Sequence, residues 1–212
     1  MSSCRHLEKR WWSKNKPGLQ NKCIDTSEVL LWLNKKPADI SRCLVEVVLR
    51  TDRAIRLQGL GNYDLEDMGT TLSCLILTRT HSVIVHVGDS RIYRLRNGRL
   101  SCLTVDHTFV QDMIFEGEVD PEHAHLHPLR HMLTRVVGTG ESLEWVDSRI
   151  DGIKAGDCFL LCTDGLYNAI AERNIIDSLA DQSDAADTAA ELVAKTLKND
   201  ARDNITAVVV KM

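Results

Sequence analysis

The sequence has no long hydrophobic run. Its 212 residues contain no apolar stretch that approaches the roughly 18 residues of a membrane-spanning helix, so we expect no segment that spans a membrane. Basic residues stand near the N-terminus (Arg5, Lys9 and Arg10), but no apolar core of about 7–15 residues follows them. The sequence therefore predicts no secretory signal.

Paired cysteines are also absent. The seven cysteines are an odd number, and no two of them form a C-x-x-C pair. This distribution argues against a disulfide framework and against a zinc site. We therefore expect reduced, mostly buried thiols in a cytoplasmic protein. The cysteines are Cys4, Cys23, Cys43, Cys74, Cys102, Cys158 and Cys162.

The overall composition is that of a soluble globular protein, with 43% hydrophobic and 26% charged residues. The charge is unevenly distributed. Residues 1–36 hold eight Lys/Arg and three Asp/Glu (net +5), and the remainder holds 18 and 27 (net −9). Such a basic leader is either a docking arm for nucleic acid or anionic lipid, or a part that does not fold with the rest. The acidic body disfavours nucleic acid.

The pattern of apolar residues becomes regular at Ala38. It predicts an amphipathic helix over 38–57, ended by Gly59 and Gly61, and strands separated by turn residues. Asn97-Gly98 is a strong hairpin signal between two of these strands. Strands and helices come in blocks, which predicts an α+β fold with packed antiparallel sheets. The strands are 71–78, 82–87, 92–96, 100–104, 145–150, 158–163 and 205–210, and the later helices are 109–116, 120–127, 172–179 and 184–197.

Three aspartates stand at predicted strand ends: Asp89 between two strands, Asp164 after an apolar strand, and Asp203 before the last strand. A carboxylate there is held rigidly, and a neighbouring glycine allows close approach of a ligand. Carboxylates without histidine or thiolate partners suit Mg²⁺ or Mn²⁺. Two such ions roughly 3.5–4 Å apart activate a water for phosphoryl displacement. Each aspartate alone is more often a turn residue.

The order and spacing of longer motifs favour metal ligands over turn residues at these aspartates. Together these motifs resemble the bacterial branch of the PPM (type 2C) family of metal-dependent protein Ser/Thr phosphatases, over about residues 38–212. The resemblance implies a four-layer α-β-β-α sandwich. The motifs are Met68-Gly69-Thr70-Thr71, Val87-Gly88-Asp89-Ser90-Arg91, Asp106-His107-Thr108, Thr134-Arg135-Val136-Val137-Gly138, Leu161-Cys162-Thr163-Asp164-Gly165-Leu166 and Asp203-Asn204-Ile205-Thr206.

The resemblance implies roles for matching positions. Asp164 and Asp203 match the ligands of a dinuclear Mn²⁺ or Mg²⁺ centre, and Asp89 matches a residue that, with Asp164, holds a third ion. Residues from about His107 to Pro128 match a mobile flap beside the active site, with His107 as a structural or hinge residue. Phosphorylated proteins are the implied substrates, and a Ser/Thr kinase is an implied partner.

Two family motifs are missing. The sequence lacks the opening R-x-x-N-E-D and D-G-x-G-G segments, which in the family supply a phosphate-binding arginine and the aspartate that bridges both metals. Without them Asp164 and Asp203 offer few ligands, and no catalytic residue is predicted. We expect residues 37–212 to form a domain incomplete at its N-terminal side, with an exposed apolar edge or face, in a truncated or rearranged phosphatase.

Alternatives remain open at this point. The histidines at 123, 125, 127 and 131 form a candidate metal cluster, but we expect solvated side chains. Trp11-Trp12 among basic residues is a candidate nucleic-acid platform, with a disordered or partner-docking tail as the commoner explanation. Two functions are compatible with the sequence: a phosphatase that uses a metal-activated water, and a non-catalytic phosphatase-like module that binds a kinase or its target.

Overall fold

The computed structural model describes residues 35–61, 65, 67–139, 141–199 and 203–212. Trp11-Trp12 and nearly all of the predicted leader 1–36 lie outside the described residues, so the domain boundary at residue 36 stays a prediction. Within the described residues, no helix combines the length and the apolar character that crossing a bilayer demands.

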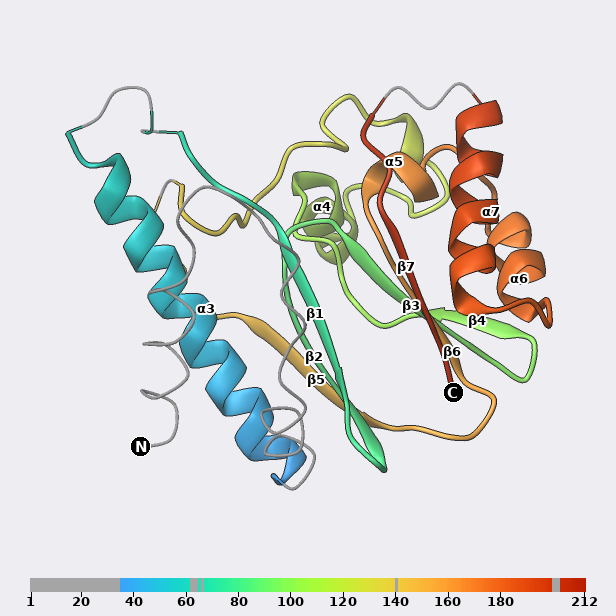
Figure 1. The fold of residues 1–212 in the computed structure, drawn as a ribbon. Helices are drawn as coiled ribbons and strands as arrows, with labels where there is room; N and C mark the ends of the chain where they lie inside the picture. The colour runs from blue at the N-terminus through green and yellow to red at the C-terminus, as the bar shows by residue number, and fades with distance from the viewer. Residues whose placement is uncertain (1–34, 62–64, 66, 140, 200–202) are drawn as a thin grey trace.

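Two antiparallel sheets form the centre of the described structure (Figure 1). The first has the strand order β1-β2-β5 and the second has the order β4-β3-β6-β7. The strands are β1 (Leu72–Leu77), β2 (His81–Val87), β3 (Arg91–Arg96), β4 (Arg99–Cys102), β5 (Asp147–Gly152), β6 (Cys158–Cys162) and β7 (Ala207–Lys211).

Helices cover the outer faces of both sheets (Figure 1). Helix α3 (Pro37–Gly59) packs against β2 and β5, and α7 (Ala185–Lys198) packs against β7. Helix α6 (Glu172–Ala180) contacts β3 and β4, while α4 (Phe109–Glu116) and α5 (Asp164–Tyr167) lie near the ends of the strands. The predicted α+β fold with four α-β-β-α layers is confirmed.

Local sequence accounts for several of these elements. Pro37 occupies the first turn of α3, where its missing N–H costs nothing. Asp184 caps α7 by accepting from the Asp187 N–H at 2.8 Å. Asn97 and Gly98 have φ values of 51° and 74°, as a tight hairpin turn between β3 and β4 requires, which confirms the predicted hairpin.

The core between the sheets contains the buried cluster Ile84, Ile92, Leu103 and Phe159. Phe159 and Ile92 are fully buried. Strands β1 and β7 are the outer strands on one side of each sheet, and Val208 on β7 is 49% exposed. The expected apolar edge stays a prediction, because one exposed valine does not test it.

Two predictions need correction. The expected helix over 120–127 is only the 3-10 turn η2 (Ala124–Leu126): Asp120 accepts the Glu122 N–H as an N-cap would, but no longer helix follows it. The thiols are not all reduced: Cys43 is disulfide-bonded. Among the described residues four cysteines are free, and the two on β6 are buried as expected. The free cysteines are Cys74, Cys102, Cys158 and Cys162.

Candidate functional site

Asp164 and Asp203 lie at the same end of a strand pair. Asp164 follows β6 and opens α5, while Asp203 precedes β7, which pairs with β6. The pairing continues past the strands, because the Thr163 N–H donates to Thr206 O at 3.3 Å and the Thr206 N–H donates to Thr163 Oγ1 at 3.0 Å. Geometry at the strand ends therefore brings the two backbone segments together.

Gly165 makes this approach possible. A Cβ atom at Gly165 would lie 2.5 Å from Asn204 O and 3.4 Å from Asp203 C. Only glycine fits at this distance, so the backbone that carries Asp203 packs directly against the residue after Asp164. The Asp203 side chain is exposed and accepts the Asn204 N–H at 2.6 Å.

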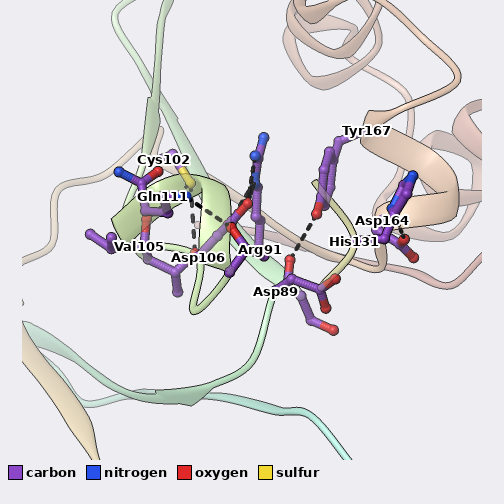
Figure 2. A network of polar contacts seen from close by, with 12 residues as sticks. Asp89, Arg91, Cys102, Val105, Asp106, Gln111, His131, Asp164 and Tyr167 are labelled. Carbon is purple, nitrogen blue, oxygen red and sulfur yellow. Dashed lines mark hydrogen bonds and ion pairs between the residues drawn. The ribbon is translucent and has the colours of Figure 1, made fainter. Parts of the chain in front are cut away.

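Asp89 lies in the turn between β2 and β3 and faces the same region (Figure 2). The Tyr167 hydroxyl donates to Asp89 O at 3.0 Å. Burial raises the pKa of Tyr167, so the phenol stays protonated and keeps this role. Because Tyr167 belongs to α5, the helix that begins with Asp164 also holds the turn that carries Asp89.

The carboxylates influence one another electrostatically. Burial raises the pKa of Asp89, and the negative charges of Asp164 and Asp106 raise it further. Each extra negative charge disfavours ionisation of its neighbour. A divalent cation placed here would relieve this repulsion, because its positive charge favours the ionised carboxylates.

Arg91 lies beside these carboxylates and is held by hydrogen bonds to neighbouring side chains. Its Nε donates to Asp106 Oδ1 at 2.9 Å, its Nη2 donates to Asp106 Oδ2 at 2.7 Å, and its Nη1 donates to Tyr93 Oη at 2.9 Å. The guanidinium also stacks 3.8 Å above the Tyr167 ring (Figure 2). Burial lowers the pKa of Arg91, but the bonds to Asp106 and the nearby tyrosines raise it above its usual range. These contacts fix the position of the Arg91 guanidinium beside the carboxylates.

One histidine of the predicted cluster, His131, lies beside the site. His131 Nδ1 lies 3.7 Å from Asp164 Oδ2, and its half-exposed ring points toward that carboxylate (Figure 2). The other histidines of the predicted cluster do not join it. His123 is 70% exposed beside Asp120, and His127 Nδ1 accepts the Leu129 N–H. No periodic spacing distinguishes His131 from these neighbours.

His107 is buried and contacts no candidate ligand. Burial lowers its pKa, partly offset by its hydrogen bond to Asp147. Its ring nitrogens face Gly88 N and Asp147 Oδ2 at 3.0 and 3.1 Å, so neither is open to solvent. The geometry agrees with a structural position.

The donor set of the site suits a hard divalent cation, because Asp89, Asp164 and Asp203 offer only oxygen atoms. Asp164 is close enough to Asp89 to raise the pKa of Asp89, and Asp203 lies at the same strand ends. Across the described part of the chain, however, no group of three His, Cys, Asp or Glu side chains is close enough together to hold a metal ion. The described residues therefore offer carboxylates for a cation but not the full ligand set of a dinuclear centre.

Comparisons with known proteins agree with the fold. The profile of the family described as protein phosphatase 2C matches residues 20–208, and so begins before the predicted boundary at residue 36. The serine/threonine protein phosphatase PstP of Mycobacterium tuberculosis is 40% identical over 146 residues, which cover 69% of this chain and 28% of PstP. The serine/threonine phosphatase stp of Listeria welshimeri is 32% identical over 188 residues, 89% of this chain and 70% of stp. The chain thus spans little more than a quarter of PstP.

Solved structures show the same architecture. The serine/threonine phosphatase of S. agalactiae superposes with a TM-score of 0.78 at 25% identity, covering 88% of this chain and 80% of that one. The catalytic domain of PstP in complex with two manganese ions superposes with a TM-score of 0.72 at 33% identity, covering 86% of this chain and 76% of that one.

Proposed function

Because this chain belongs to the protein phosphatase 2C family, we propose that it hydrolyses phosphoserine and phosphothreonine in proteins with the help of a divalent cation. The observation that carries the proposal is the meeting of Asp89, Asp164 and the Asp203 backbone at one end of the central sheets. Relatives named as serine/threonine phosphatases, one of them solved with two manganese ions, support it.

Asp164, Asp203 and Asp89 are the residues that would hold the cation. When bound, such an ion supplies a water of lowered pKa and neutralises charge on the phosphoryl group. The chain's own contribution is preorganisation: α5 fixes Asp164 at its first turn, and Tyr167 of the same helix fixes the Asp89 carbonyl. Mn²⁺ and Mg²⁺ both fit an all-oxygen donor set, so either ion satisfies the proposal.

The substrates in this proposal are phosphorylated proteins, and a Ser/Thr kinase is the partner whose action the chain would reverse. The cytoplasm is the proposed location.

Turnover of p-nitrophenyl phosphate in Mn²⁺ tests the proposal. Asp164→Ala and Asp203→Ala should each lower the rate by at least about a hundredfold, as removal of a preorganised electrostatic group does. Asp177→Ala is the matched control, because Asp177 is half exposed on α6 and pairs only with Arg173 among the described contacts. Its rate should equal that of the unmodified chain.

Equal rates in all four proteins would contradict the phosphatase proposal and favour a non-catalytic phosphatase-like module. The observation that favours such a module is that, within the described residues, no three candidate ligand side chains lie close enough together to hold a metal ion. Calorimetric titration with Mn²⁺ then separates the two functions further, because a phosphatase binds the ion and loses this binding in Asp164→Ala.

A further inference from the structure

His107 grips the residue that precedes Asp89 by two hydrogen bonds. The Gly88 N–H donates to His107 Nδ1 at 3.0 Å, and the His107 N–H donates to Gly88 O at 2.8 Å. Because Nδ1 accepts here, the ring proton is assigned to Nε2, which lies 3.1 Å from Asp147 Oδ2 and 3.2 Å from Arg135 Nη1, itself bonded to Asp147 Oδ1. The ring is therefore held on both nitrogens, and its tautomer is fixed.

Gly88 has little freedom of its own. Its φ of 110° is in the region that favours glycine, and a Cβ atom there would lie 2.4 Å from Thr71 Cγ2. On the other side of Asp89, Ser73 Oγ donates to Ser90 O at 2.8 Å. Hydrogen bonds thus hold the backbone on both sides of Asp89, and His107 makes the bonds to the residue before it.

The same histidine lies where a long excursion of the chain begins and ends. Thr108 and Leu133 form an isolated β-bridge, and the Thr134 N–H donates to His107 O at 2.9 Å. We define residues 108–133 as the excursion; it includes α4 and η2. Asp106, directly before His107, holds Arg91, which lies two residues after Asp89. The base of the excursion and the Asp89 turn are therefore joined on both sides of the aspartate.

We propose that His107 is a positioning residue, whose Nδ1 acceptor fixes the Gly88 amide and so holds Asp89 in place to bind a divalent cation. The proposal rests on the proposed function, because it assigns Asp89 to the cation. His107 does not act as a proton donor to substrate, since its side chain is 3% exposed and both ring nitrogens are occupied.

Two substitutions by amide side chains, made in the full chain, distinguish the role of Nδ1 from that of Nε2. His107→Asn retains an oxygen acceptor near the place of Nδ1, whereas His107→Gln carries its amide one bond further out, near the place of Nε2. Calorimetric titration with Mn²⁺ should give about a tenfold weaker Kd for His107→Gln, in the range expected for an unpaired buried N–H. His107→Asn should remain within about threefold of the unmodified chain on the same grounds.

A matched background makes the test specific to positioning. In Asp89→Asn, His107→Gln should weaken Mn²⁺ binding no further, because the carboxylate that it positions is already gone. An equal additional loss in that background, or an unchanged Kd for His107→Gln alone, would overturn the proposal.

Amide hydrogen exchange at Gly88 provides a readout that needs no metal. His107→Gln should speed exchange of the Gly88 amide at least tenfold relative to the median of the β2 amides, and His107→Asn should not. If the unmodified chain binds no Mn²⁺, the proposed function fails while this exchange pattern still decides the role of His107. Unchanged exchange at Gly88 in His107→Gln would overturn that role.

Discussion

Acidification from pH 7.5 to 5 should destabilise the described domain through His86. This side chain is 1% exposed, with Nδ1 2.9 Å from Ser73 Oγ and Nε2 3.1 Å from Val105 O. Burial lowers the pKa of His86 to about 4, and the nearby His107 ring, centred 4.9 Å away, lowers it too. The negative charges of Asp106 and Asp147 oppose this shift without cancelling it.

Proton linkage gives the direction and the magnitude of this change in stability. Between the unfolded pKa of 6.5 and the folded pKa of about 4, the unfolded chain binds a proton that folded His86 does not. The contribution of neutral His86 to the free energy of unfolding is therefore fully present above pH 6.5 and decreases as the pH falls toward 4. At about 1.4 kcal/mol per pKa unit, the loss from His86 reaches about 2 kcal/mol at pH 5 and about 3.4 kcal/mol below pH 4.

Neighbouring groups modify this value in known directions. Burial also lowers the pKa of His107, so His107 adds to the loss on acidification. The pKa of Asp89 is raised by burial and by Asp164, so the folded state takes up a proton at Asp89 more readily and gains stability as the pH falls.

Urea unfolding followed by circular dichroism at pH 7.5 and pH 5, with chelator present, measures the effect. The free energy of unfolding of the unmodified chain should fall by at least about 2 kcal/mol, the share that comes from His86. His86→Gln cannot titrate, so its loss over the same interval should be smaller by that amount, whatever its stability at pH 7.5. A His86→Gln protein that loses as much as the unmodified chain would refute the reasoning.

Two further predictions concern backbone contacts of buried or close-packed residues. Asp52→Ala should lower the free energy of unfolding in urea by about 2–4 kcal/mol, because the buried carboxylate accepts the Gly138 N–H at 2.9 Å and pairs with Arg56 at 3.0 Å. Asp52→Asn should lower it less. A decrease below about 1 kcal/mol in the alanine variant would contradict this account. Gly165→Ala should weaken calorimetric Mn²⁺ binding about tenfold by forcing Asn204 O away, whereas Gly152→Ala, whose added Cβ would lie 4.0 Å from the nearest atom, should leave it unchanged.

Local signals predicted much of the fold. The helix over 109–116, capped by the Thr108 side chain, and the Asn97-Gly98 hairpin occur where the sequence indicates them. Both depend on neighbours within a few residues, so the sequence alone determines them. The expected helix after Asp120 failed because capping chemistry also serves isolated turns, and only packing decides whether a helix continues.

The candidate site was predictable only in part. Asp164 and Asp203 could be placed together because each adjoins an apolar strand at its end. The bonds from Tyr167 to Asp89 and from His107 to Gly88 join residues 78 and 19 positions apart, and no pattern in the sequence indicates them. The approach of His131 to Asp164 likewise depends on how the excursion returns to the sheets.

The closed base of the excursion has a consequence for how such a protein diversifies. Thr108 and Leu133 meet in a bridge, so the backbone leaves and rejoins the domain at nearly the same place. Sequence between these residues can lengthen, shorten or change its side chains without altering the spacing of the strands that carry the aspartates. This segment beside the candidate site can thus change while the strands that lead to Asp89, Asp164 and Asp203 stay constant.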